Sequence, residues 1–307
     1  MKILTVLTGG TISCSKSDGV LSPDSGNGKY LLDAAARAGV RAEFVTTQPY
    51  LVLSENLGAE HLKALRACIL SRLGEGFDGI IVTHGTDTLP TTAAYLDYVL
   101  GAAGLPIALV SANYPLRDPR SNGLANFSAA VALIRAGERG VFVAYQNTGE
   151  PFATIHRGRD VLPHMPLEDS VFSLFRKPFG FVREGAFVRN PDYPQTACED
   201  LSGCELSGSV MYLHPQVGAT YPALPDGTKA VLFEGWHSGT LPTARPAFIA
   251  FCRQARQKGV PLFLTGSQEG FAYESKQAFA DLGIQVLPPM SPVAAYVKLW
   301  LMGRDES

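Results

Sequence analysis

The strongest constraint on the fold is an alternation of short, β-branched apolar runs with longer amphipathic stretches. In the first half, strands are predicted at 2–8, 41–47, 79–84, 106–112 and 140–147, and helical spacing of apolar residues predicts helices at 60–73, 91–100 and 122–137. Strands that are apolar throughout and separated by helices are typical of βαβ units in a parallel sheet with both faces covered. The sequence therefore predicts an α/β fold with a Rossmann-like parallel-sheet domain at the N-terminus.

The pattern changes at 148–207, which is rich in proline and polar residues, and regular spacing then returns. The later strands are predicted at 208–214, 229–235, 260–265 and 284–287, with helices at 245–258, 273–282 and 291–302. We expect three parts: an N-terminal catalytic α/β domain at 1–185, a linker at 186–207 and a smaller C-terminal α/β domain at 208–307. A chain of 307 residues fits two domains at about 150 residues each.

The charge balance excludes several classes of partner. The chain has 26 basic and 28 acidic residues, a net charge of −2, and no basic run that would indicate nucleic acid or a membrane surface as a partner. No segment reaches the roughly 20 apolar residues of a membrane span. With 46% hydrophobic and 18% charged residues, a disordered chain is excluded too. The expected partner is a small molecule.

The N-terminus and the cysteines predict a cytoplasmic location. Met1–Thr8 looks like one short strand rather than a secretory signal. The five cysteines are odd in number and lack metal-ligand spacing: Cys14, Cys68, Cys198, Cys204 and Cys252. Reduced thiols are favoured, although Cys198 and Cys204 could pair in an oxidising compartment. We expect no metal and no cofactor.

Two polar segments end predicted strands and are the candidates for chemistry. The first is Thr8-Gly9-Gly10-Thr11-Ile12, whose glycines permit a sharp turn and close approach of the backbone to a ligand, and whose N–H groups could bind an anion. Thr11 would then stand at the carboxyl end of a strand, where open α/β sheets bind ligands. The alternative is an ordinary glycine turn with an incidental threonine.

The second segment is Val82–Pro90, which gathers His84, Thr86, Asp87 and Thr88 around Gly85 just before a predicted helix. A hydroxyl beside a carboxylate can relay a proton or hold an attacking water. The alternatives are structural: Asp87 or Thr88 could cap the helix, and His84 could be a buried histidine with satisfied hydrogen bonds.

In their order and spacing, TGGTI and HGTDT resemble the bacterial-type L-asparaginase family. Further segments are similar to that family: Leu53-Ser54-Glu55-Asn56, Ser111-Ala112-Asn113, and the closing helix from Ser291 to Leu299. The resemblance implies hydrolysis of L-asparagine to L-aspartate and ammonia, with Thr11 as the nucleophile of a β-acyl-enzyme. It also implies a homodimer or homotetramer.

The remaining roles follow from the same resemblance. Thr86 would position the water, with Asp87 beside it at the substrate α-amino group. Ser54 would hold the α-carboxylate, Glu55 the α-amino group, and the Ala112 carbonyl the departing amide. Gly10 would lie against the substrate.

Two positions depart from the family pattern. The loop tyrosine after TGGTI is replaced by an aliphatic residue in Asp18–Pro23, and the nearest later tyrosine is Tyr30. The lysine behind the Thr-Asp pair aligns with Pro163. His164, one residue further, could serve as the base, and Tyr273-Glu274 could complete a neighbouring subunit's site.

Two other functions stay open from the sequence. One methylene changes binding by only about 1–3 kcal/mol, so a broader glutaminase or amidase is not separated from an asparaginase. A catalytically weak amino-acid-binding protein with the same fold is the alternative from a different class.

Overall fold

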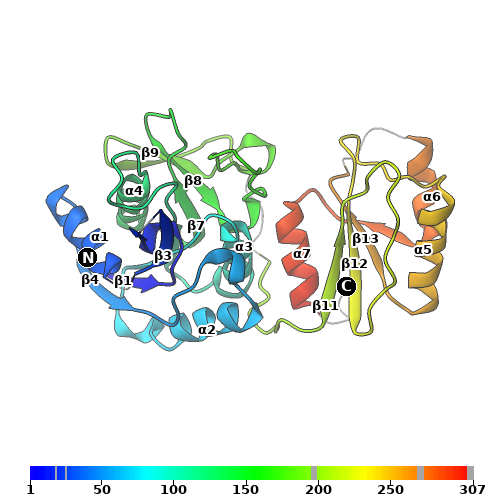
Figure 1. Ribbon diagram of the computed structural model, residues 1–307. Helices are drawn as coiled ribbons and strands as arrows, with labels where there is room; N and C mark the ends of the chain where they lie inside the picture. The colour runs from blue at the N-terminus through cyan, green and yellow to red at the C-terminus, as the bar shows by residue number, and fades with distance from the viewer. Residues whose placement is uncertain (18, 25, 195–198, 268–272, 303–307) are drawn as a thin grey trace. The chain divides into compact units, whose positions relative to one another are not determined.

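The computed structural model describes all residues except 18, 25, 195–198, 268–272 and 303–307. The described chain forms two compact units, Met1–Ser202 and Gly203–Ser307 (Figure 1). Both are α/β units, as the alternating pattern predicts. Among the described residues, none of the helices combines the length and the apolar character needed to cross a membrane.

The first unit is built on an eight-stranded sheet in the order β10-β9-β8-β7-β6-β5-β1-β4. Its five consecutive parallel strands are those that the sequence predicts: β1 (Lys2–Leu7), β4 (Glu43–Thr47), β5 (Gly79–Thr83), β6 (Pro106–Val110) and β7 (Gly140–Tyr145). Strands β5, β6 and β7 are buried along their whole length. This is why they read as continuous apolar runs.

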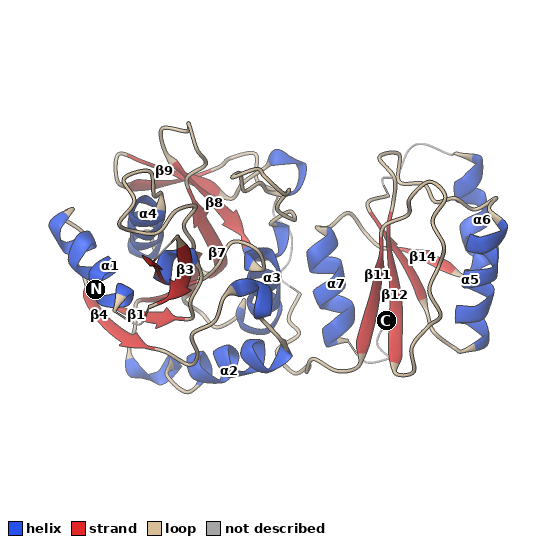
Figure 2. Ribbon diagram, in the orientation of Figure 1, coloured by secondary structure: helices blue, strands red, loops and turns tan. Residues whose placement is uncertain are grey.

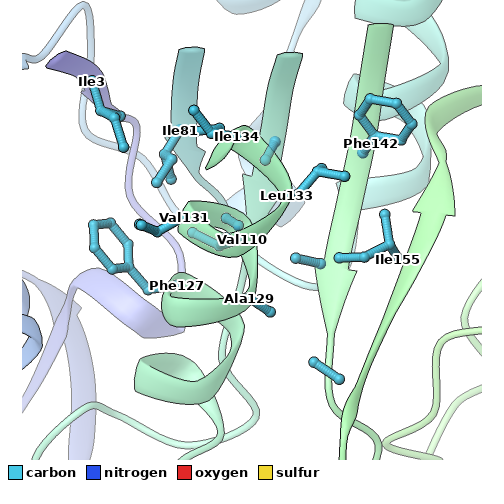
Figure 3. Close-up of a cluster of buried hydrophobic side chains, with 14 of the residues drawn as sticks. Ile3, Ile81, Val110, Phe127, Ala129, Val131, Leu133, Ile134, Phe142 and Ile155 are labelled. Atoms are coloured by element: carbon cyan, nitrogen blue, oxygen red, sulfur yellow. The ribbon is translucent and has the colours of Figure 1, made fainter. Parts of the chain in front are cut away.

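Four helices accompany this sheet: α1 (Asn27–Arg37), α2 (Ala59–Leu70), α3 (Leu89–Leu100) and α4 (Gly123–Arg135). Helices α1 and α4 pack on one face, where α4 lays its apolar side chains against alternate strand residues (Figure 3). Residues labelled there are Phe127, Val131, Leu133 and Ile134 of α4, with Ile3, Ile81, Val110, Phe142 and Ile155 of the strands. The intervening strand residues Leu4, Ile80 and Leu109 are buried as well, so both faces of the sheet are covered.

Three antiparallel strands extend this sheet and were not among the predicted ones. They are β8 (Ala153–Arg157), β9 (Gly180–Arg183) and β10 (Ala186–Arg189). A two-residue turn at Glu184-Gly185, with φ of 50° and 76°, joins β9 to β10, as the twist of a tight hairpin requires. The predicted linker at 186–207 therefore begins inside the sheet, and the contact boundary between the units falls after Ser202.

The segment after the first strand also holds structure that was not predicted. Strands β2 (Cys14–Ser17) and β3 (Val20–Pro23) pair as an antiparallel hairpin, and α1 follows directly. The hairpin is short, and three of the four β3 residues are exposed. Strands this short and this exposed carry little apolar alternation for a sequence reader to detect.

The second unit has a four-stranded, fully parallel sheet in the order β11-β12-β13-β14. The strands are β11 (Ser209–Leu213), β12 (Thr228–Glu234), β13 (Leu262–Thr265) and β14 (Ile284–Val286), and the helices are α5 (Pro246–Gln257), α6 (Glu274–Leu282) and α7 (Pro292–Leu301). Helix α7 covers one face, and α5 and α6 cover the other (Figure 2). Each of these strands and helices lies within about two residues of its predicted range at either end.

Candidate active site

The turn after β1 places Thr11 at the carboxyl end of the parallel sheet. Gly9 and Gly10 have φ of 116° and 77°, conformations that L side chains rarely adopt. Thr11 then opens the 3₁₀ turn η1 (Thr11–Ser13) and is partly exposed. The Gly10 N–H donates to the Val52 carbonyl at 3.2 Å, so this N–H is held within the protein rather than offered to an anion as we expected.

Gly10 brings the two polar segments into backbone contact. A Cβ built on Gly10 would overlap the main chain of His84 and Gly85. A Cβ on Gly85 would in turn overlap the Ser54 side chain and lie 3.1 Å from Gly10 Cα. Three segments far apart in the sequence, around Gly10, Ser54 and Gly85, are therefore packed as closely as their backbones allow.

Hydrogen bonds join the second and third of these segments. Ser54 is 5% exposed and opens the turn η2 (Ser54–Asn56), from which its Oγ donates to Asp87 Oδ2 at 3.0 Å. Thr88 Oγ1 donates to the Ser54 carbonyl at 3.0 Å. Asp87 itself is exposed, so its carboxylate is accessible to a ligand. Ser54 and Asp87, predicted to bind one substrate, are thus direct neighbours.

Glu55 lies near the first segment. Burial raises the pKa of the Cys14 thiol, and the Glu55 charge raises this pKa further. Cys14 directly follows η1, and its Sγ donates to the Gly10 carbonyl at 3.2 Å. The exposed Glu55 side chain therefore contributes negative charge beside the glycine turn that carries Thr11.

His84 has a structural role, which was one of its two interpretations. Its ring is buried, with Nδ1 2.8 Å from the Gly85 carbonyl and Nε2 2.8 Å from Thr92 Oγ1. Burial lowers the pKa of His84 to about 4. The neutral ring therefore ties the end of β5 to helix α3 and does not face a ligand.

Thr86 and Asp87 line a cavity of about 530 Å³. The other lining residues are Asn113, Tyr114, Tyr145 and the segment 164–171. Thr11, Ser54 and Glu55 are not among them, so the structure brings Thr86 and Asp87 to this cavity and leaves the other three beside it. The cavity can hold a ligand considerably larger than a water cluster.

A network around Asp169 forms one wall of the cavity and was not anticipated from the sequence. Its carboxylate accepts hydrogen bonds from Tyr145 Oη at 2.5 Å, Asn113 Nδ2 at 2.7 Å and Thr148 Oγ1 at 2.6 Å. Burial and the Asp169 carboxylate both raise the pKa of Tyr145, so its phenol stays protonated. The available signal was the pair Glu168-Asp169 after a proline-rich turn, in a region where the family likeness is weak.

Ala112 lies two residues beyond β6 and is fully buried. Side-chain amides hold the chain around it: Asn126 Nδ2 donates to the Ser111 carbonyl at 2.9 Å, and Asn122 Oδ1 accepts from the Asn113 N–H at 3.0 Å. The predicted Ala112 position is therefore a rigid strand end whose next residue lines the cavity.

The remaining candidates lie elsewhere. Leu21 of the β2–β3 hairpin lines a separate cavity of about 470 Å³, and the Tyr30 ring lies 4.1 Å from the Arg117 guanidinium. Tyr273 caps helix α6 and Glu274 is its first residue, both in the second unit. Across the described residues, no group of three His, Cys, Asp or Glu side chains gathers to hold a metal ion.

The cysteines bear on the predicted compartment. Cys14, Cys68 and Cys252 are free thiols. The alternative pairing of Cys198 with Cys204 involves Cys198, which lies outside the described residues.

Comparisons with known proteins identify the family. Residues 2–172 match the family model "Asparaginase, N-terminal". The chain is 26% identical to the L-asparaginase of Thermococcus kodakarensis, over 99% of this chain and 93% of that protein. It is also 25% identical to a subunit of the Glutamyl-tRNA(Gln) amidotransferase of Pyrococcus abyssi, over 83% of this chain but only 61% of that longer protein.

Solved structures show the same fold. The L-asparaginase I of Vibrio cholerae has a TM-score of 0.78 at 21% identity, covering 99% of this chain and 94% of that one. The thermostable L-asparaginase of Thermococcus kodakarensis gives 0.76 at 22% identity, covering 98% and 92%. The two-domain α/β architecture is therefore confirmed. Taken with the matched family model, these findings show that the chain belongs to the asparaginase family and is an amidohydrolase.

Proposed function

We propose that this enzyme hydrolyses L-asparagine to L-aspartate and ammonia, with Thr11 as the nucleophile. The observation that carries the proposal is the packing of Gly10, Gly85 and Ser54 against one another. It holds Thr11, the Ser54–Asp87 pair and Thr86 on neighbouring strand ends of one sheet. A nucleophilic hydroxyl, a carboxylate and a water-holding hydroxyl on one rigid edge are the parts that acyl transfer needs.

The reaction proceeds in two steps. Thr11 Oγ bonds to the side-chain amide carbon and gives up its proton, the C–N bond breaks, and the nitrogen leaves as ammonia after gaining that proton. A water molecule held by Thr86 and Asp87 then attacks the ester carbon, the Thr11 Oγ–C bond breaks, and the hydroxyl is restored. The scheme uses no metal and no cofactor.

The substrate's own charges match the predicted binding residues. An amino acid is a zwitterion, so its site needs a carboxylate near the ammonium and hydroxyl or N–H donors near the carboxylate. Asp87 and Glu55 serve the ammonium, the Ser54 hydroxyl serves the carboxylate, and the Ala112 carbonyl accepts from the departing amide. Gly10 contributes by its close backbone approach, since its N–H is donated to Val52.

A second candidate substrate is L-glutamine. The amidotransferases among the relatives favour it, because their name joins amide transfer to a glutamine tRNA. The cavity of about 530 Å³ also has room for one more methylene. The discrimination between the two amides is worth only about 1–3 kcal/mol in such a pocket.

Ammonia release from L-asparagine, L-glutamine and succinamate, each measured over a range of concentrations, tests the proposal. We expect the highest kcat/KM for L-asparagine and the lowest for succinamate, which lacks the ammonium group. A higher kcat/KM for L-glutamine would make the enzyme a glutaminase. Binding of L-aspartate that raises the melting temperature, with no ammonia released from any amide, would instead support an amino-acid-binding protein.

Location and assembly are part of the same proposal. The free thiols of Cys14, Cys68 and Cys252 support a cytoplasmic location, as does the likeness to a Campylobacter jejuni protein described as a probable cytoplasmic L-asparaginase. A homodimer or homotetramer, with Tyr273-Glu274 completing a partner's site, follows from the family likeness. Sedimentation of the purified protein tests the assembly directly.

A further inference from the structure

Among the described residues that line the cavity containing Thr86 and Asp87, His164 supplies the one imidazole. Its Nε2 is buried and has no hydrogen-bond partner within the described part of the chain. A buried ring nitrogen without a partner is costly in a folded protein, so such atoms are frequently functional. The hydrolytic step needs such a group, because the attacking water must lose a proton.

The chain holds His164 firmly at the base of a loop. The Leu162 N–H donates to the Phe172 carbonyl at 2.9 Å. Asn147 then bonds Val171 on both sides: its Oδ1 accepts from the Val171 N–H at 2.8 Å and its Nδ2 donates to the Val171 carbonyl at 3.1 Å. The loop 163–171 is thereby closed at its ends, which fixes the imidazole beside the cavity rather than leaving it on a free segment.

A buried ion-pair cluster anchors the chain just before this loop. Asp97 of α3 is fully buried and pairs with Arg157 at 2.7 Å and with Arg159 at 2.9 Å. Arg159 lies in the turn η4 (Gly158–Asp160), shortly before His164. Helix α3 starts at Leu89, directly after Thr86-Asp87-Thr88, so one helix positions both the Thr–Asp pair and the approach to His164.

The surroundings of His164 suit a proton acceptor. Burial lowers its pKa from the ordinary value of 6.5, so the ring is neutral at pH 7 and one nitrogen can accept a proton. The charges of Asp87 and Asp169 and the Thr86 main chain act in the opposite direction and favour the protonated ring. His156 of β8 is the other titratable neighbour; it is neutral, because burial lowers its pKa to about 3.

The other lining groups are poorer bases. The Tyr145 phenol stays protonated, and the Asp169 carboxylate already accepts three hydrogen bonds. Asp87 accepts from Ser54, and a carboxylate of ordinary basicity, with a pKa of about 4, is a weak acceptor at neutral pH. An imidazole with a pKa closer to the working pH is the more effective general base.

We propose that His164 Nε2 is the general base for the second step, in which water hydrolyses the Thr11 acyl-enzyme. The water held at Thr86 and Asp87 transfers a proton to Nε2 as its oxygen bonds to the ester carbon. The ester C–O bond then breaks, and the proton returns from the imidazolium to Thr11 Oγ. This inference rests on the proposed function, since it assigns a group to that reaction.

The test measures ammonia release from L-asparagine by the wild-type enzyme and by H164Q, whose amide cannot accept a proton at neutral pH. Loss of a general base lowers kcat by about 10²–10⁴-fold. Because only the second step is slowed, H164Q should release a rapid burst of ammonia equal to the enzyme concentration. H61Q serves as the matched control: His61 bonds the Gly58 N–H at 3.0 Å outside the cavity, and its replacement should leave kcat unchanged.

Hydroxylamine supplies a readout that a structural role would not move. It is a strong nucleophile that needs no base, so it should release the acyl group as the β-hydroxamate and restore most of the turnover of H164Q and of a second variant, H164N. The wild-type kcat should fall in acid with a slope of one proton, and that limb should vanish in both variants.

The outcomes separate the two proposals. If the wild-type enzyme releases no ammonia from any amide, the proposed function fails. If the wild-type enzyme is active and H164Q matches its kcat, the role of His164 alone is wrong. The same conclusion follows if H164Q and H164N are slow but show neither the burst nor the rescue by hydroxylamine.

Discussion

Ser54 and Asp87 are joined by a 3.0 Å hydrogen bond, although they lie 33 positions apart in the chain. The serine is buried and the aspartate is exposed, so the bond fixes a surface carboxylate from below. The glycine at position 85 makes this possible, because any side chain there would overlap Ser54. The substrate-binding pair is therefore a product of backbone packing as much as of side-chain chemistry.

Replacement of Ser54 by alanine should weaken substrate binding more than it weakens the fold. Loss of one hydrogen bond costs about 1 kcal/mol of unfolding free energy. The loss of a donor for the substrate carboxylate, together with a less fixed Asp87, should raise KM for L-asparagine at least tenfold. Steady-state kinetics and urea unfolding measure the two effects. S71A is the control, because Ser71 donates to Cys68 on the surface; a KM shift of the same size there would contradict the interpretation.

Replacement of Gly10 by alanine should prevent stable folding of the site. The backbone there has φ of 77°, and a Cβ would overlap the Gly85 main chain. Strain at a positive φ costs about 1–3 kcal/mol, and overpacking adds about 1–3 kcal/mol. Gly39 has φ of 85° and open space around it, so G39A should show the strain alone. Equal unfolding midpoints for the two variants would disprove close packing at Gly10.

Replacement of Asp97 by asparagine should be strongly destabilising. Its carboxylate is fully buried between Arg157 and Arg159, and removal of one partner leaves buried charge uncompensated at a cost of about 3–5 kcal/mol. The exposed pair of Arg72 and Glu75 gives a matched control, for which E75Q should cost under about 1 kcal/mol. Guanidinium unfolding of both variants checks the difference, and similar losses would contradict the assignment of a buried cluster.

Acid should destabilise the protein through His84 and His156. Burial lowers their pKa values to about 4 and about 3, against 6.5 for an ordinary histidine. The unfolded chain therefore binds protons below about pH 6.5 that the folded protein does not bind, and stability falls as the pH drops from 6.5 toward 4. Each group contributes up to about tenfold in the unfolding constant per pH unit. H156Q should show a shallower fall than the wild type, and identical slopes would rule out a neutral buried His156.

The parts of the fold that could be predicted are those in which local pattern and burial agree. Strands β5 and β12 are apolar throughout because helices cover both faces of their sheets, so a single pattern identifies them. Strands β8 to β10 carry mixed aromatic and charged residues, such as the Arg183 guanidinium 4.5 Å from the Phe152 ring. Their pairing depends on neighbours in the sheet, which a local pattern does not reveal.

The candidate site divides in the same way. Thr86 and Asp87 could be predicted because their motif follows a strand, and the structure puts them in a cavity. Asp169 could not, because its role depends on Tyr145, Asn113 and Thr148, which come from separate segments. His164 was only one of several candidates from the sequence, since nothing local shows that its loop folds over Thr86.

The most direct test of the account is the position of the covalent intermediate. The enzyme is quenched in acid during turnover of L-asparagine, digested, and analysed by mass spectrometry for an aspartyl ester. The account predicts that the ester is on Thr11 and that T11A forms none and releases no ammonia. An ester on Thr86, or undiminished ammonia release by T11A, would contradict it.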